Sequence, residues 1–185
     1  MSAVTKERDA SFIGTQYSGD YIGGSPNGAI SKESQIAVYK NALSVVERLH
    51  RQLLDVVKDD LDRSGHEDLT PVQALLIFNI GAEEWSAGEL RTKGFYLGSN
   101  VSYNLKKLHD LKYVESKKSN FDKRQIKLRL TATGLSVREK LDSMFTRHAN
   151  TIGPVGGVDT VQLETASKML TRLERFWHDQ IKFRM

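Results

Sequence analysis

Hydrophobic residues recur every three or four positions in two long stretches of the chain, and this period predicts two long helices. The first stretch runs from Ser34 to about Arg63 without glycine or proline, and the Ser-Gly-His at 64–66 ends it. The second covers about Thr160 to Lys182, where hydrophobic spacings of three and four alternate as in a coiled-coil seam. A small domain cannot cover a helix as long as the first, so a partner element of similar length is expected.

Two shorter helices are predicted next by their capping residues. Thr70 can cap a helix that opens with Pro71, and Gly81 ends it. A short third helix is predicted from Ser86 to Arg91, because Ser86 and Glu89 have the spacing of a capping box.

A fourth helix, of about 14 residues, is predicted to begin at Leu97-Gly98-Ser99. Its hydrophobic positions form one stripe, which consists of Val101, Leu105, Leu108 and Leu111. The other side chains must point away from that stripe, so the helix has a polar face. This polar face consists of Asn100, Ser102, Tyr103, Lys106, Lys107 and Asp110.

Two short strands, Tyr113–Ser116 and Gln125–Leu130, are predicted after this helix. The second strand alternates clearly between hydrophobic and polar residues. Its inward residues are Ile126, Leu128 and Leu130, and its outward residues are Gln125, Lys127 and Arg129. The turn between the strands carries the charged residues Asp122, Lys123 and Arg124.

A fifth helix is predicted through Leu135–Phe145, with Thr131 or Thr133 as its cap. The Gly-Pro-Val-Gly-Gly at 153–157 separates it from the last long helix. Residues 1–33 are rich in Gly, Ser, Asn and Thr and show no hydrophobic period, which predicts a flexible or irregular arm. The glycines of the arm lack the Gly-Lys-Ser/Thr of a phosphate-binding loop.

Composition excludes several classes of protein. The chain has no cysteine, and therefore no disulfide, thiolate metal ligand or cysteine nucleophile. No stretch approaches the roughly 18 apolar residues of a membrane span, and the first residues lack the apolar core of a secretory signal, so a cytoplasmic location without a membrane partner is expected. The five histidines show no short metal-ligand spacing and no acid–base constellation appears, so neither an enzyme nor a cofactor is predicted.

Positive charge is concentrated in the middle of the chain. The formal net charge is +4, but residues 91–129 contain 11 Lys and Arg against 3 Asp and Glu, so the remainder is net acidic. Such a block favours a polyanionic partner, nucleic-acid phosphates first among them, although a solvated lysine face has the same composition.

The predicted order is helix, helix, short helix, polar-faced helix, hairpin and helix, which is the order of a winged helix-turn-helix. In that fold the polar-faced helix enters the major groove of DNA, where donors, acceptors and methyl groups distinguish base pairs. The hairpin reaches the backbone or the minor groove, whose negative potential suits arginine. The predicted fold class is therefore mostly α with a small β-hairpin.

Several motifs resemble the MarR family of bacterial transcriptional regulators. They are Leu69-Thr70-Pro71-x-Gln73, Gly-Glu-Leu at 88–90, VSYNLKKLHDLKYV at 101–114 and DKR…LTATG at 122–134. The resemblance covers about residues 34–182 and extends to the alphaproteobacterial branch that includes a regulator of L,D-transpeptidase genes. The chain departs from the family pattern at Arg91, where a small residue is usual, and at Gln125, where Asp, Ser or Gly is common.

The resemblance implies a homodimeric regulator, expected to be a repressor, that binds a pseudo-palindromic operator in double-stranded DNA. Residues 34–63 and 135–185 would form a helical dimerisation region, and residues 64–134 the winged helix-turn-helix domain. A small aromatic effector would loosen DNA binding from a site near the junction of these regions, but the sequence assigns no effector pocket.

The resemblance also implies roles for individual residues. Arg124 would enter the minor groove from the wing tip, and Asp122 would orient the turn. Ser99, Asn100, Ser102 and Tyr103 would face bases or nearby phosphates. Charge and position add further candidates for phosphate contacts, which are Lys106, Lys107, Lys117, Lys118 and Lys123.

An alternative hypothesis stays open at this point. The chain would then be a helical interaction protein whose basic block binds an acidic partner, or binds DNA without sequence preference. A palindromic duplex that competes no better than a random duplex would favour this alternative.

Overall fold

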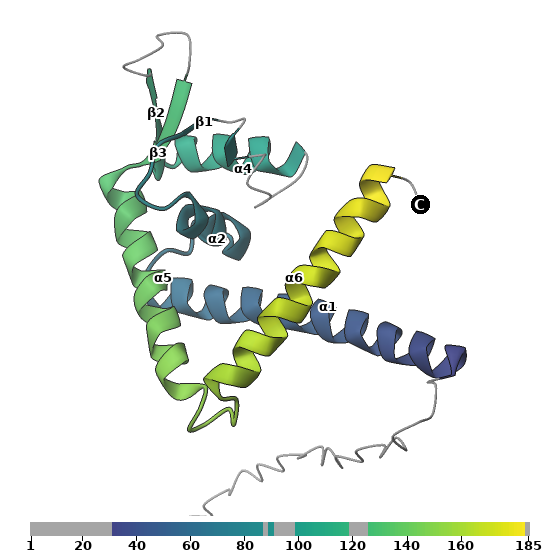
Figure 1. Ribbon diagram of the computed structural model, residues 1–185. Helices are drawn as coiled ribbons and strands as arrows, with labels where there is room; N and C mark the ends of the chain where they lie inside the picture. Colours follow the sequence, from purple (N-terminus) through teal and green to yellow (C-terminus); the bar gives the residue numbers. More distant parts are fainter. Residues whose placement is uncertain (1–30, 87–88, 91–98, 119–125, 184–185) are drawn as a thin grey trace, which may run out of the picture. The chain divides into compact units, whose positions relative to one another are not determined.

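The structure, a computed structural model, describes residues 31–86, 89–90, 99–118 and 126–183 (Figure 1). Its helices are α1 (Lys32–Arg63), α2 (Pro71–Ile80), α4 (Ser99–Asp110), α5 (Ala132–Thr151) and α6 (Thr160–Phe183). Its strands are β1 (Trp85–Ser86), β2 (Val114–Lys118) and β3 (Ile126–Leu130). A mostly helical chain with one small antiparallel sheet confirms the predicted fold class. The predicted arm, apart from its last three residues, and the charged turn lie outside the described residues.

Helix α1 begins two residues earlier than predicted, because the Ser31 hydroxyl accepts a hydrogen bond from the Ser34 amide at 3.1 Å. It ends at Arg63 as predicted, where Gly65 adopts a φ of 74° that suits glycine. The chain divides into two compact units between Ser44 and Val45, within this helix. In the second unit, only Val57 and Leu61 of α1 are buried.

Helix α2 has the predicted caps. The Thr70 hydroxyl accepts a hydrogen bond from the Gln73 amide at 3.3 Å, and the Gln73 side chain accepts one from the Thr70 amide at 3.0 Å. This capping box satisfies two amides that a helix start leaves without partners. Gly81 ends the helix with a φ of 68°.

The sheet has a third strand that the sequence analysis did not predict. Strand β1 pairs with β3, with Trp85 opposite Leu128, so the order is β1-β3-β2. The Trp85 indole donates a hydrogen bond to the Ile80 carbonyl at 2.7 Å, which holds β1 against the end of α2. A strand of two residues is too short to show a period of two, and this explains why the pattern missed it.

The predicted third helix is described only in part. Residues 89–90 are helical, and Ser86, which the prediction placed in this helix, belongs to β1. Ser86 still makes the predicted capping box, because its hydroxyl accepts from the Glu89 amide at 3.1 Å and its amide donates to the Glu89 carboxylate at 2.6 Å. Arg91 lies outside the described residues.

The hydrophobic stripe of α4 is confirmed for Val101, Leu105 and Leu108, which are buried, but it is wrong for Leu111, which is 39% exposed. The helix ends at Asp110, and Lys112 takes a left-handed φ of 62°. The Tyr113 amide then donates to the Leu108 carbonyl at 2.9 Å, as in a Schellman motif, and Tyr113 enters the core in place of Leu111.

Helix α5 is capped by Thr131, one of the two predicted candidates, whose hydroxyl accepts from the Gly134 amide at 3.2 Å. Gly134 is needed for packing, because a Cβ there would lie 2.2 Å from the Tyr113 carbonyl oxygen. Val137, Leu141 and Met144 of α5 are buried, so α5 connects the sheet to the hydrophobic core.

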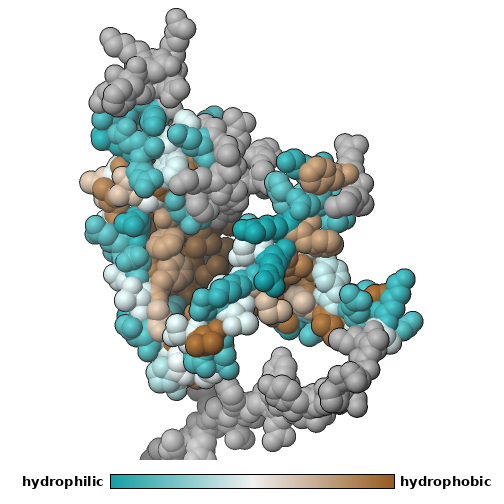
Figure 2. Space-filling model, viewed as in Figure 1, coloured by the Kyte–Doolittle hydropathy of each residue, from teal (hydrophilic) through white to brown (hydrophobic). Residues whose placement is uncertain are grey.

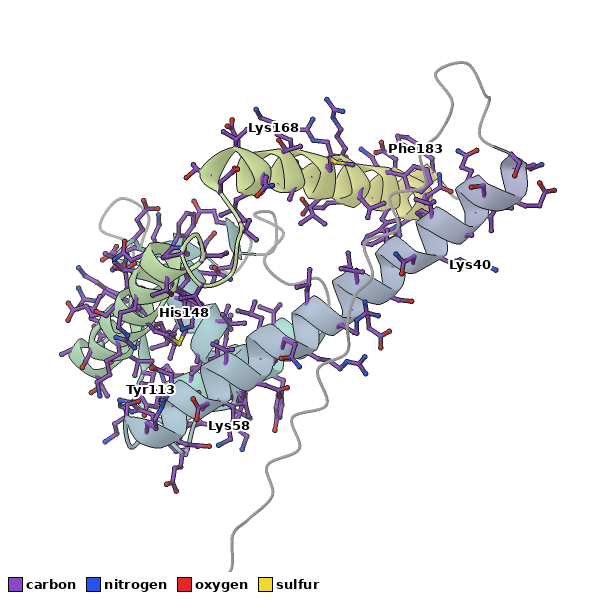
Figure 3. All side chains as sticks on the ribbon, turned by 90° about the horizontal axis from the view of Figure 1, so that it is seen from below. Lys40, Lys58, Tyr113, His148, Lys168 and Phe183 are labelled. Carbon is purple, nitrogen blue, oxygen red and sulfur yellow. The ribbon has the colours of Figure 1, made fainter. Side chains whose placement is uncertain are left out.

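Helix α6 buries none of its residues in the single chain. Figure 3 shows its side chains, with Lys168 and Phe183 labelled. The seam predicted for this helix consists of Leu163, Ala166, Leu170, Leu173 and Trp177. Leu163 and Leu170 are exposed, and Trp177 is partly buried. Within the described ranges, no helix combines the length and the apolar character needed to cross a membrane.

Candidate nucleic-acid interface

Helix α4 presents a polar, cationic face to solvent. Ser102, Lys106 and Lys107 are exposed, and Tyr103 is 60% exposed. The Lys107 ammonium lies 5.9 Å from the centre of the Tyr103 ring, within the range of a cation–π contact. Residues at these spacings share one side of a helix, so the structure brings four of the predicted site residues together.

The orientation of this face is fixed from the opposite side of α4. Leu105 and Leu108 are buried in the core. The Gln73 side chain of α2, which is also buried, donates a hydrogen bond to the Asn104 side chain at 3.3 Å. Because the Asn104 side chain is hydrogen-bonded to α2, it joins the two helices. Contacts with a ligand would therefore come from its exposed neighbours on α4.

Two further predicted residues, Ser99 and Asn100, belong to the first turn of α4 by their backbone. Their side chains lie outside the described residues, as does the side chain of Lys118 at the end of β2. Asp122, Lys123 and Arg124 also lie outside them. The roles of these residues therefore stay predictions.

The solvent face of the sheet carries alternating charges. Arg129 of β3 lies directly opposite Glu115 of β2, and its Nε and Nη2 atoms are each 2.6 Å from the Glu115 carboxylate. Glu84, just before β1, lies 4.0 Å from Arg129 and 3.4 Å from the Lys117 ammonium. The predicted phosphate ligand Lys117 thus has a carboxylate partner in the residue just before β1.

Glu84, Glu115 and Arg129 are not among the site residues predicted from the sequence. A sequence signal existed only for the Glu115–Arg129 pair, since opposite charges occur on two strands of one predicted hairpin. No signal existed for Glu84, because its place beside the hairpin depends on the unpredicted strand β1.

A polar network anchors the start of β2 to the helical body. The Tyr113 hydroxyl donates to the Asp68 carboxylate at 3.1 Å and lies 3.4 Å from His66 Nδ1, and the Lys140 ammonium of α5 lies 3.0 Å from His66 Nε2. Since Tyr113 uses its only proton on Asp68, His66 must donate through Nδ1 and accept from Lys140 through Nε2. This network requires a neutral imidazole at His66.

Burial and charge in this network shift two pKa values. The pKa of His66 is lowered by burial and by the Lys140 charge, against a smaller opposing effect of Asp68. The pKa of Tyr113 is raised to about 12 by burial and by its hydrogen bond to Asp68. Both shifts favour the protonation states that the hydrogen bonds require. Tyr113 is labelled in Figure 3.

The described residues contain no cluster of three or more His, Asp or Glu side chains that could hold a metal ion. The cleft between the end of α1 and α5, with a volume of about 500 Å³, mixes cationic and anionic side chains, Lys140 and Arg147 with Asp60 and Glu139. Asp60 and Arg147 form an ion pair at 3.4 Å. The exposed face of α4 is therefore the better candidate for a functional surface.

A family model and a curated protein match this chain. The family model described as "MarR family" matches residues 67–125, from just before α2 to the residue that precedes β3. The exopolysaccharide II synthesis transcriptional activator ExpG of Rhizobium meliloti (strain 1021) is 33% identical over 151 residues, which are 82% of this chain and 77% of ExpG.

Solved structures show the same fold at lower identity. Streptococcus pneumoniae FabT, crystallised in complex with DNA, matches with a TM-score of 0.62 and 20% identity over 76% of this chain and 98% of that chain. The S. aureus MepR–DNA complex matches with a TM-score of 0.57 and 17% identity over 71% of this chain and 95% of that chain. A mutant MarR from E. coli, complexed with operator DNA, matches with a TM-score of 0.57 and 16% identity over 70% of this chain and 91% of that chain.

Proposed function

The chain belongs to the MarR family of transcriptional regulators, and from this premise we propose that it binds a pseudo-palindromic operator in double-stranded DNA as a homodimer. Residues 64–134 form the DNA-binding domain in this proposal, and residues 34–63 and 135–185 form the dimerisation region. Helix α4 lies in the major groove, and the β2–β3 hairpin reaches the adjoining backbone or minor groove.

The observation that carries the proposal is the exposed face of α4. Lys106 and Lys107 form no ion pair within the described residues, so both are available to phosphates. Ser102 and Tyr103 supply hydroxyl groups that can donate to or accept from base edges and phosphates. The part-buried hydrogen bond between Gln73 and Asn104 supports a fixed orientation of these side chains, and base readout requires fixed orientation.

The remaining predicted contacts complete the interface in this proposal. Ser99 and Asn100 extend the α4 face toward its N-terminus. Lys118 and Lys123 contact phosphates beside the hairpin, Asp122 orients the turn, and Arg124 enters the minor groove.

A second copy of the chain is the proposed partner of the exposed hydrophobic residues on the terminal helices. Leu163, Leu170 and Ile181 of α6 are exposed, as are Leu49 and Leu53 of α1. Exposed hydrophobic residues that recur along two long helices favour association with another protein surface. A symmetric dimer would also present two copies of α4 to half-sites about one turn, ~34–36 Å, apart.

The proposed effector is a small aromatic molecule that binds the DNA-incompetent arrangement of the dimer more tightly than the competent one. Figure 2 shows hydrophobic surface over α2 and α5. Leu75 and Phe78 of α2 and Phe145 of α5 are only partly buried, and the centroids of the two phenylalanine rings lie 5.1 Å apart, edge to face. This surface supports apolar binding near the junction of the two regions.

The Rhizobium relative is named a transcriptional activator, whereas repression is the expectation from the sequence. We propose that the position of the operator relative to the promoter decides between the two outcomes. Either outcome requires the same DNA-binding step.

A fluorescence anisotropy titration with a labelled duplex from the chain's own upstream region tests this function. Affinity should fall steeply as salt rises, because each phosphate contact releases counterions. An unlabelled palindromic duplex should compete better than a random duplex of equal length. Equal competition would favour electrostatic binding without readout, and absent or salt-insensitive binding would end the proposal.

A further inference from the structure

We propose that Glu84 limits the affinity of this protein for DNA by holding Lys117 away from the phosphate backbone. The inference rests on the proposed function and adds a positioning residue that acts through a neighbouring cation. Glu84 does not touch DNA in this proposal. It competes with phosphate oxygens for the Lys117 ammonium.

The sheet geometry places Glu84 where it can act on the hairpin. Strands β1 and β2 are not neighbours, since β3 runs between them. Trp85 pairs with Leu128, and Ser86 pairs with Lys127. The same antiparallel register, extended by one residue, places Glu84 beside Arg129. From there the Glu84 carboxylate reaches across β3 to the Lys117 ammonium at 3.4 Å.

The two cations beside Glu84 depend on it to different degrees. Arg129 has its closest partner in Glu115, which binds two of its nitrogen atoms at 2.6 Å, and Glu84 is a distant second partner at 4.0 Å. For Lys117, Glu84 is the ion-pair partner that the described residues provide. Removal of Glu84 should therefore free Lys117 far more than Arg129.

The residue opposite Lys117 explains why its position is sensitive to Glu84. Lys117 faces Lys127 across the β2–β3 ladder, and like charges directly opposite each other repel. The described residues offer Lys127 no ion pair of its own. The Glu84 carboxylate thus stabilises Lys117 on the β1 side of the sheet, and without it both lysines would turn toward an external anion.

The Glu84–Lys117 pair is weak enough to be exchanged for a phosphate contact. The two side chains are 40% and 42% exposed, so solvent and salt screen their attraction. A phosphate oxygen can replace the carboxylate, but binding then begins with the loss of an existing ion pair. Glu84 consequently lowers the number of cations that gain a new partner on DNA.

A purely structural role for Glu84 predicts the opposite sign. If Glu84 mainly aligned the hairpin with β1, its removal would loosen the sheet and weaken DNA binding. If it competes with phosphate, its removal strengthens binding and makes the salt dependence steeper. The sign of the change in affinity therefore separates the two roles.

The test measures operator affinity by anisotropy over a salt series for wild type, Glu84→Gln and Glu83→Gln. Glu83 is the matched control, because it is the neighbouring exposed carboxylate and has no ion pair in the described structure. We expect Glu84→Gln to bind about twofold to fivefold more tightly than Glu83→Gln, with a salt slope steeper by about one phosphate contact. In a Lys117→Gln background, Glu84→Gln should give no gain beyond that of Glu83→Gln.

Equal affinity of the two glutamine variants, weaker binding by Glu84→Gln, or a gain that persists without Lys117 would each overturn the inference. Glu84→Asp provides a second variant that keeps the charge but shortens its reach, and it should bind with intermediate affinity. If wild type itself fails to bind the operator, the proposed function fails instead.

Discussion

The exposed face of α4 and the solvent face of the sheet both carry lysine or arginine, but they differ in whether these cations have carboxylate partners. On α4, Lys106 and Lys107 have no carboxylate partner among the described residues, and Lys107 lies near the Tyr103 ring. On the sheet, Arg129 and Lys117 are paired with Glu115 and Glu84. Among the described residues, the α4 face carries two lysines without a carboxylate partner, whereas two of the sheet's cations, Lys117 and Arg129, have one.

This difference shows that the count of basic residues overstates the charge available to DNA. The sequence places 11 Lys and Arg in residues 91–129, but two of the described ones, Lys117 and Arg129, are paired with the carboxylates of Glu84 and Glu115. A lysine or arginine that is paired with a carboxylate must lose that partner before it contacts a DNA phosphate. An unpaired one makes the contact without this loss, and counterions leave the DNA. The α4 face should therefore contribute more to affinity than the sheet face.

The largest effect is expected from the double substitution Lys106→Ala and Lys107→Ala. Loss of two free phosphate contacts should weaken operator binding by about 2–3 kcal/mol and reduce the salt slope by about 2. Lys58→Ala with Lys168→Ala is the matched control, because it removes two exposed lysines that pair with carboxylates on α1 and α6. A loss of equal size in the control would mean that net charge, rather than the α4 face, governs affinity.

Arg124→Ala should weaken operator binding by about 1–3 kcal/mol while the dimer persists, because the residue is proposed to enter the minor groove. Anisotropy gives the affinity, and light scattering on a sizing column gives the mass. Unchanged affinity would remove the wing tip from the mechanism. A monomeric variant would show that the substitution acts through assembly.

Arg129→Gln should weaken operator binding by less than about 0.5 kcal/mol in the same anisotropy assay. Two carboxylates already hold this guanidinium, and exposed ion pairs of this kind contribute little. A loss as large as that of Arg124→Ala would show that Arg129 exchanges its partners for phosphate. The two faces would then not differ in the way proposed.

The smallest effect concerns the network that ties the sheet to α5. The pKa of His66 is lowered in the folded chain, so the unfolded chain binds more protons just below the ordinary pKa of 6.5. The His66 contribution to stability is therefore complete above that pKa and is lost as pH falls below it. Thermal unfolding at pH 8 and pH 5.5 should show a smaller drop in Tm for His66→Gln than for wild type. Equal drops would exclude His66 as a source of the pH dependence.

Features fixed by local chemistry could be predicted from the sequence. The α2 capping box needs only Thr70 and Gln73, and the Thr131 cap of α5 needs only a hydroxyl three residues before an amide. The buried stripe of α4 follows from helical spacing. The exposed polar face opposite that stripe could be predicted from the same spacing.

Features that depend on contacts between distant segments could not be predicted. Leu111 was expected in the core, but Lys112 ends the helix in a left-handed conformation that glycine usually marks, and Tyr113 occupies the core instead. The pairing of Glu84 with Lys117 requires β1, which is too short to leave a pattern. The sequence therefore indicated where cations lie but not which of them are neutralised.

Lysine acetylation followed by mass spectrometry tests the central claim most directly. With an amine-reactive reagent, Lys106 and Lys107 should be labelled readily in the free protein and should be protected when a saturating operator duplex is bound. Lys168, which lies on α6, should be labelled equally in both states. Equal labelling of Lys106 and Lys107 with and without bound operator would contradict the assignment of the α4 face to DNA.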